Sequence, residues 1–364
     1  MKIKLFFPLI IIAFTALILQ FTNCKKEKEK ESEVNVTGVT LNVNEYKLGV
    51  YGTLQLTATV QPKEAANKVV TYKSSNQAVA TVTNAGLVTG ILLGTAIITV
   101  TTKDGNKTDQ CNLTIVSVNP PEMIFVEGGT FTMGCVSEDT ICFYNEKPSH
   151  QVTLSSFHIG KYEVTQSLWM QFMGNNPSIY KGNTNPVERV SWNDIVGTAG
   201  NYITVKGINY YENGFIYKLS KHTGKQYRLP TEAEWEFAAC GGNKSKGYIY
   251  CGSNSVFEVA WYIGNCKTKE YPNGKTYSVG SLLPNELGIY DMSGNVWELC
   301  SDWYGEYSVG AEENPVGPST GLSRVIRGGS WSNDATFTRV TSRATGGPDV
   351  RDYRIGFRLA MCLE

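Results

Sequence analysis

Histidines and cysteines are the residues of this 364-residue chain whose types could support metal, redox or nucleophilic chemistry. The histidines are His150, His158 and His222. No nucleophile motif accompanies them, so nothing supports a Ser–His–Asp triad. Lone histidines usually have structural roles, but His150 and His158 could join a carboxylate across the fold in a 2-His-1-carboxylate iron site. A non-haem iron enzyme therefore stays open as an alternative.

Nine cysteines are many for a chain of this length, and in an oxidising compartment they favour structural disulfides. Cys135 and Cys142 bracket a short loop, and so do Cys240 and Cys251. Closure of either loop is geometrically easy and needs Cα atoms about 4.4–6.8 Å apart. We predict a disulfide within each of these two pairs.

Cys300 follows the most turn-rich stretch of the chain. If free, it could be a reactive thiol, but a disulfide with Cys266 or Cys362 is the favoured interpretation. The stretch itself covers residues 284–303, and its centre, Asp291-Met-Ser-Gly-Asn295, has turn-forming residues between dense apolar and aromatic ones. We predict a tight turn held inside a core.

Carboxylates flank this turn. After the helix that begins near Thr231 the chain is loop-rich, so its backbone polar groups need side chains, water or ions as partners. Calcium takes several oxygens, including carbonyls that a tight turn exposes, and Asp291 and Glu298 could supply carboxylates. The alternative is that Asp291 caps the turn and Glu298 forms a buried ion pair with one of the many arginines.

Four segments of distinctive composition occur in order in the second part of the chain. The first opens a helix, because Thr231 and Glu234 fit a capping box. The segments are RLPTEAEWE at 228–236, GIYDMSGNVWE at 288–298, RVIRGGSW at 324–331 and GFR at 356–358. Together they resemble the formylglycine-generating enzyme (sulfatase-modifying factor) family, from about Met123 to the C-terminus.

The resemblance implies an α+β, loop-rich sulfatase-modifying-factor domain that is related to C-type lectins and holds structural calcium. The calcium ligands of the family fall here on Asp291, on the carbonyls of Gly294 and Val296, and on Glu298. The resemblance also implies an oxidase that converts a sulfatase cysteine to formylglycine with copper(I), which two thiolates five positions apart hold.

The copper ligands of the family have no counterpart in this sequence, which contains no cysteine between the RGGSW and GFR motifs. Alignment backward from GFR puts Ala335 and Val340 at the two positions, and alignment forward from the Gly-Gly-Ser motif puts Thr338 and Arg343 there. Neither pair can hold copper(I), so copper is not expected. Related proteins with this fold use iron and an H-x-x-x-H-x-E arrangement, a spacing that the three histidines lack.

The domain that carries these motifs follows a different kind of domain. Residues 34–118 alternate in period two, are rich in β-branched residues and are punctuated by turn residues, which predicts an all-β sandwich. The order GVTLN, QLTATVQP, TYKSSNQAVATV, GLVTG and GTAIITV resembles the bacterial immunoglobulin-like group 2 domain. We interpret this domain as a spacer, with Cys111 as a buried small hydrophobe. Residues 119–122, with two prolines, form the hinge to a second domain at 123–364.

An insertion relative to the family lies inside the second domain. Residues 201–211 alternate around Lys206-Gly207, which predicts a β-hairpin. The hairpin is either a surface elaboration or part of a binding groove.

The first 24 residues have the pattern of a targeting segment. Two lysines precede an apolar run at 5–19, and Cys24 follows. The pattern resembles a bacterial lipoprotein signal, which implies a lipid on Cys24. An uncleaved anchor is the alternative, although the run is short against the roughly 17–25 residues of a spanning helix. Residues 25–33 form a charged tether, so we expect a lipid-anchored protein of the bacterial cell envelope, periplasmic or surface-exposed.

The charge balance also bears on partners. Lys plus Arg and Asp plus Glu both number 33, so no global field attracts nucleic acid, and the C-terminal arginines lack the interleaved aromatics of a base-stacking platform. We expect no nucleic-acid partner and expect the arginines in carboxylate forks. The favoured function is a non-catalytic domain that binds a polypeptide or glycan ligand at the envelope. The alternative is an oxidase of this family, with a relocated thiol or with iron.

Overall fold

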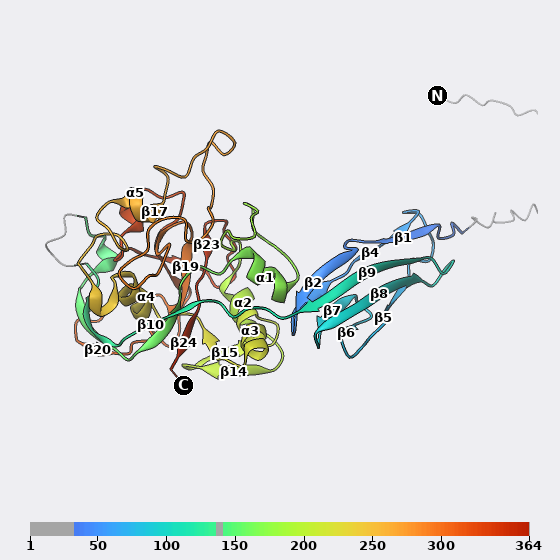
Figure 1. The fold of residues 1–364 in the computed structure, drawn as a ribbon, viewed down its shortest axis with the longest axis horizontal. Coiled ribbons are helices and arrows are strands. Elements are labelled where there is room, and N and C mark those ends of the chain that lie inside the picture. The colour runs from blue at the N-terminus through green and yellow to red at the C-terminus, as the bar shows by residue number, and fades with distance from the viewer. Residues whose placement is uncertain (1–32, 136–140, 364) are drawn as a thin grey trace, which may run out of the picture.

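A computed structural model describes residues 33–135 and 141–363 of the chain. It shows an elongated β domain beside a larger mixed domain (Figure 1). The predicted signal segment with Cys24, and the predicted tether up to residue 32, lie outside the described residues. Within the described residues, no helix has the length and apolar character needed to cross a membrane.

The first domain is the predicted immunoglobulin-like sandwich. Its strands alternate inward and outward side chains: Ala96 and Ile98 of one strand are buried while Ile97 between them is exposed. Cys111 is fully buried in the same core, as predicted. The larger sheet has the order β2 (Glu45–Gly49), β9 (Thr108–Val116), β8 (Gly94–Thr102) and β5 (Val70–Ser74). A second sheet has the order β3 (Thr53–Gln55), β7 (Leu87–Gly90) and β6 (Ala80–Val82). The remaining pair is β1 (Gly38–Leu41) with β4 (Ala58–Gln61).

The two domains touch beyond the linker between β9 and the first strand of the second domain. Helix α1 (Gln166–Met173) packs next to β2 (Figure 1). The Tyr46 hydroxyl donates to the Met170 carbonyl at 3.2 Å, and Lys218 Nζ donates to the Thr53 hydroxyl at 2.8 Å. The residues 119–122 that we predicted as a hinge are therefore not the only connection between the domains.

Three short sheets form the frame of the second domain. One has the order β10 (Met123–Val126), β13 (Phe157–Gly160), β24 (Ala360–Cys362) and β16 (Tyr227–Arg228). Another has β11 (Gly129–Met133), β12 (His150–Leu154) and β20 (Glu312–Glu313). The third has β22 (Arg343–Gly346), β21 (Arg324–Arg327), β19 (Trp297–Trp303) and β23 (Ile355–Gly356). The GIYDMSGNVWE, RVIRGGSW and GFR motifs each contribute to this third sheet or adjoin it, so the fold brings them together.

Helices and small ribbons surround these sheets. The helix predicted from RLPTEAEWE is α4 (Glu232–Ala239), and the capping box of Thr231 and Glu234 is present. The predicted hairpin is also present, because β14 (Tyr202–Val205) pairs with β15 (Ile208–Tyr211) around a turn at Lys206 and Gly207. The remaining elements are α2 (Trp192–Val196), α3 (Phe215–Thr223), α5 (Val256–Val259), β17 (Ala260–Trp261), β18 (Ser293–Gly294) and the 3-10 turns at Tyr144–Glu146, Gly242–Lys244 and Ala335–Thr338.

Helix α4 is buried on all sides, and this determines much of the electrostatics of the domain. Its Glu232, Glu234 and Glu236 are all buried. A buried carboxylate is stable only when it is paired and hydrogen-bonded, so each of these glutamates faces an arginine. The predicted arginine–carboxylate forks are thus a consequence of burying a charged helix.

Candidate functional site

The predicted turn at 291–295 is buried and has the expected conformation. Asp291, Gly294 and Asn295 all have positive φ angles, of 61°, 83° and 56°. A Cβ on Gly294 would lie 2.3 Å from the Trp261 carbonyl oxygen, so only glycine fits there. The turn is held by the short parallel pairing of β17 with β18.

Three carboxylates meet behind this turn, and sequence reasoning identified two of them. Asp291 accepts from the Gly280 amide at 2.6 Å, and burial raises its pKa to about 6, with Glu298 adding to the rise. The third carboxylate is Glu163, which accepts from Asn295 Nδ2 at 2.7 Å and from the Val296 amide at 3.2 Å. Burial, and then Asp291 and Glu298, raise the pKa of Glu163 well above its ordinary value.

Glu298 is engaged with an arginine. Its two oxygens accept from Arg358 Nε at 2.6 Å and Nη2 at 2.5 Å, and Trp235 Nε1 donates to it at 2.7 Å. This is the buried ion pair that we kept as the alternative interpretation of Glu298. The Arg358 guanidinium also acts on the other two carboxyl groups, because its positive charge lowers the pKa of Asp291 and of Glu163 against the effect of burial.

The donor set at this turn matches a hard cation in part. Three buried carboxyl groups lie near one arginine, and carboxylates and carbonyls are the ligands that calcium prefers. Among the predicted ligands, Asp291 already has one carboxylate oxygen bound by the Gly280 amide. Glu298, by contrast, is committed to Arg358 and Trp235, so it supplies charge rather than a free ligand oxygen.

The positions that the motif spacing predicted for the copper thiolates have structural contacts. Thr338 is buried and its hydroxyl donates to the Ala335 carbonyl at 3.0 Å. Val340 lies in a hydrophobic core, and Arg343 forms a fork with Glu232 at 2.7 and 2.6 Å. None of these groups is a soft ligand.

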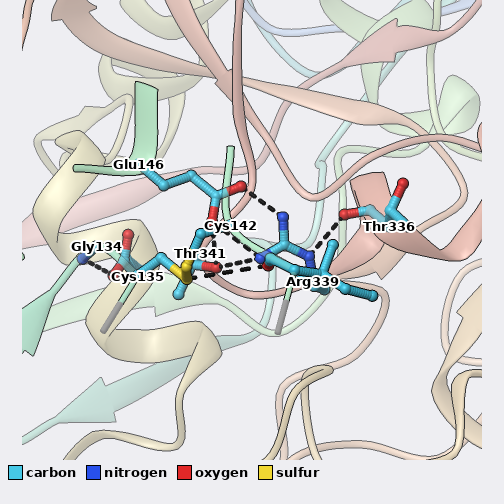
Figure 2. The surroundings of a disulfide bond; sticks show 9 residues. Gly134, Cys135, Cys142, Glu146, Thr336, Arg339 and Thr341 are labelled. Carbon is cyan, nitrogen blue, oxygen red and sulfur yellow. Dashed lines mark hydrogen bonds and ion pairs between the residues drawn. A yellow bond between two sulfur atoms is a disulfide. The ribbon is translucent and has the colours of Figure 1, made fainter. Parts of the chain in front are cut away.

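The predicted disulfide between Cys135 and Cys142 is present, with Cα atoms 5.9 Å apart. Figure 2 shows it beside the Glu146 carboxylate, which Arg339 holds through two guanidinium nitrogens at 2.9 and 2.5 Å. The Thr336 carbonyl also accepts from Arg339, at 2.9 Å. The disulfide therefore closes a loop next to one of the buried ion pairs.

The other predicted disulfides are not formed. Cys240 and Cys251 are both free thiols, which corrects the prediction that they pair; Cys251 is part of a hydrophobic core and Cys240 packs against it. Cys300 is free and buried as well, with neither predicted partner bonded to it. Burial raises the pKa of the thiols of Cys240, Cys251 and Cys300, so they pack as neutral hydrophobes and supply no thiolate.

The two histidines considered for an iron site lie on different sheets. His150 begins β12, packs against the Tyr307 ring at a tilt of 57° and faces Glu312 at 3.6 Å. His158 lies in β13 against Phe125. Among the described residues, no cluster of metal-binding side chains contains a histidine. The structure therefore does not assemble the 2-His-1-carboxylate site.

Two adjoining pockets open on either side of Trp303, and sequence reasoning did not predict them as sites. The first, about 460 Å³ in volume, is called here the cationic pocket, because Lys206, Arg228 and Arg324 are its charged lining residues. The predicted hairpin forms one wall of it, which answers whether that insertion shapes a groove. Its remaining lining is mostly apolar and aromatic.

The second pocket, of about 400 Å³, is called here the acidic pocket. Trp303, Val316 and Pro318 line both pockets and separate them. Burial, and then Glu232, raise the pKa of Asp302 to about 7. The acidic pocket is defined by Glu232, Asp302, Glu306 and Glu312, with His150 and Arg343.

Comparison with known proteins assigns the class. Residues 113–363 match the Sulfatase-modifying factor enzyme 1-like domain and residues 35–113 the Bacterial Ig-like domain (group 2). The chain therefore belongs to the sulfatase-modifying factor family and carries an Ig-like domain in front, as the motifs predicted. The fold class predicted from the sequence is confirmed.

Relatives within this family have different names. The chain is 38% identical over 251 residues to the chaperone protein LppX of Paenibacillus barcinonensis, covering 60% of this chain and 82% of the relative. It is 30% identical to the formylglycine-generating enzyme of Streptomyces coelicolor, covering 64% of this chain and 87% of that enzyme. It is also 33% identical to the serine/threonine-protein kinase pkn1 of Chlamydia pneumoniae, over 66% of this chain but only 38% of the kinase.

Solved structures show the same fold. Treponema denticola variable protein 1 superposes with a TM-score of 0.55 at 29% identity, over 66% of this chain and 95% of that chain. PvdO from Pseudomonas aeruginosa superposes with a TM-score of 0.55 at 27% identity, over 67% of this chain and 95% of its own. Both matches cover about the share of the chain that the second domain occupies.

Proposed function

We propose that this chain is a non-catalytic binding protein of the bacterial cell envelope, whose sulfatase-modifying-factor domain binds a polypeptide. The immunoglobulin-like domain acts as a spacer, and the lipid on Cys24 ties the protein to the membrane. Such a protein would display the second domain away from the membrane, where an unfolded or partly folded chain can reach it.

The observation that carries this proposal is the state of the thiols. Formylglycine generation with copper(I) requires two thiolates that converge on one metal ion. The aligned positions hold Ala335 and Val340, or Thr338 and Arg343, and these side chains are occupied in packing or ion pairing. Burial raises the pKa of the thiols of Cys240, Cys251 and Cys300, which favours their protonated form.

A polypeptide ligand is favoured over a glycan by the relatives and by the pocket. The relative with 38% identity is called a chaperone protein, a name that describes binding to other polypeptides. In the cationic pocket, Trp192 and Trp303 each have a ring face covered by Arg324, so these faces are not free to stack on a sugar.

Calcium belongs to this proposal as a structural ion. It would bind at Asp291 and at the carbonyls of Gly294 and Val296, where it would offset the excess negative charge of the three carboxylates. Its role would be to hold the buried turn in place. No chemical step is assigned to it.

The test of catalytic silence is a mass-spectrometric assay of a Cys-x-Pro-x-Arg peptide incubated with the purified protein and copper(I). We expect no formylglycine product, while the formylglycine-generating enzyme of S. coelicolor converts the same peptide in parallel. The Cys300→Ser variant serves as the control for a relocated thiol. Product that disappears in Cys300→Ser would overturn the proposal and establish an oxidase.

A further inference from the structure

Arg324 differs from every other buried arginine of the described chain. Six arginines are buried, and five of them form ion pairs with glutamates. The five pairs are Arg228 with Glu234, Arg327 with Glu236, Arg339 with Glu146, Arg343 with Glu232 and Arg358 with Glu298. Arg324, only 7% exposed, has no carboxylate within ion-pair distance among the described residues.

Two tryptophans hold the Arg324 guanidinium in a fixed plane. Its central carbon lies 3.7 Å from the ring centre of Trp192 and 3.4 Å from that of Trp303. Nη1 donates to the Ser301 carbonyl at 2.7 Å, which fixes rotation within that plane. The stacking favours the charged form, but it satisfies none of the N–H groups along the edge.

The unused edge of Arg324 is the edge that other arginines use to bind carboxylates. Arg343 and Arg358 each bind a glutamate through Nε and Nη2 together. In Arg324 the buried Nε has no acceptor within the described part of the chain. Burial lowers the pKa of Arg324 to about 10, so the side chain is still charged at neutral pH. A bound anion would offset the free-energy cost of burying this charge.

The pocket around Arg324 contains cations and no acids. Lys206 and Arg228 line it too, and the Glu234 carboxylate that pairs with both lies outside the lining. No aspartate or glutamate is among its lining residues. On the far side of Trp303, the acidic pocket has the opposite charge, so an anionic group is attracted to one side only.

We propose that the cationic pocket binds an acidic side chain of a polypeptide, whose carboxylate takes the Nε and Nη2 edge of Arg324. This inference rests on the proposed function and specifies its ligand. A planar carboxylate matches the two parallel N–H donors. Apolar groups of Ile208, Val316 and Pro318 line the same pocket and would contact the residues that flank the acid.

The test uses two pools of acetylated, amidated pentapeptides, one with glutamate and one with glutamine at the centre, and equal mixtures at the other positions. The mature full-length protein is immobilised, and the retained peptides are quantified by mass spectrometry. We expect glutamate peptides to be enriched about tenfold over glutamine peptides, the ratio that one charge-assisted fork supports.

Variants locate the binding site. Arg324→Gln should abolish the enrichment, whereas Arg351→Gln, which removes an exposed arginine paired with Asp194, should keep it. Because Arg324→Gln could disturb folding, a second variant leaves Arg324 in place: Ser319→Glu adds a competing carboxylate to the exposed rim of the pocket. It should also abolish the enrichment, while Ser319→Gln, equal in size, should not.

The outcomes separate this inference from the proposed function. Equal retention of both pools overturns the carboxylate site but leaves polypeptide binding intact. Enrichment that survives in both Arg324→Gln and Ser319→Glu also overturns the site, because the preference would then arise elsewhere. Retention of neither pool overturns both.

Discussion

The two pockets beside Trp303 share a wall but treat charge in opposite ways. In the acidic pocket Glu232 is bound by Arg343, lies 3.4 Å from Arg327 Nε and accepts from the Tyr307 hydroxyl at 3.2 Å. In the cationic pocket Arg324 has two aromatic faces and one carbonyl, and no acid. The comparison teaches that a charged side chain in a pocket wall indicates a ligand only where no side chain of opposite charge in the protein already pairs with it.

The largest expected effect comes from removing one arginine from each pocket. Arg343→Met leaves Glu232 buried with a weaker partner, so we expect a loss in the free energy of unfolding on the order of 3–5 kcal/mol. Arg324→Met leaves no carboxylate unpaired and should lose about 1 kcal/mol or less. Urea unfolding followed by tryptophan fluorescence measures both, because all seven tryptophans lie in the second domain. Equal losses in the two variants would contradict the comparison.

The second effect is a pH dependence that belongs to the acidic pocket. Asp302 accepts from the Glu232 amide at 3.0 Å, and burial raises its pKa to about 7. The folded state thus holds the proton at pH values where the unfolded state, with a pKa near 3.8, has released it. The contribution of Asp302 to the free energy of unfolding should be greatest below about pH 4 and fall by roughly 1–4 kcal/mol as the pH rises to 7.

Asp302→Asn is the matched variant for this prediction, since asparagine keeps an acceptor for the Glu232 amide and cannot titrate. Its stability relative to the natural protein should therefore improve between pH 5 and pH 8, as measured by urea unfolding at each pH. A constant difference across that range would show that Asp302 does not titrate there.

The smallest effect extends the comparison to the turn at 291–295, where three buried carboxyl groups lie near one arginine. Calcium at about a hundredfold over its Kd should stabilise the second domain by about 2.7 kcal/mol, and a chelator should remove this. Asp291→Asn should lose the response to the chelator, whereas Glu312→Gln in the acidic pocket should keep it. The melting transition reported by tryptophan measures the response, and one that persists in Asp291→Asn would place calcium elsewhere.

Local patterns predicted the elements of this fold well. The Thr231 and Glu234 cap, the hairpin around Lys206 and the alternating strands of the Ig-like domain all follow from spacings of a few residues. The Cys135–Cys142 disulfide is of the same kind, because its loop is short. Each of these features depends on neighbours in the sequence, which the sequence itself displays.

The candidate sites depended on long-range partners and were predicted less well. Glu163 joins the turn from 132 residues away, and no spacing connects the two. The Cys240–Cys251 disulfide was also predicted wrongly, because both cysteines are free thiols. Their short spacing makes a disulfide possible, but it does not show which core residues each sulfur packs against. The hairpin wall of the cationic pocket was recognised as a possible groove, but the arginine opposite it was not.

The sequence by itself determined the family and the two-domain order, because motifs are read directly from the chain. It also predicted that arginines would pair with carboxylates. Only the tertiary structure decided which buried arginine of the described residues has no carboxylate partner. Arg343 and Glu232 are separated by 111 residues, and Arg339 and Glu146 by 193, so their pairing follows from burial in one core. Arg324 resembles the other arginines in sequence and differs from them only because the fold stacks tryptophans, and no acid, against it.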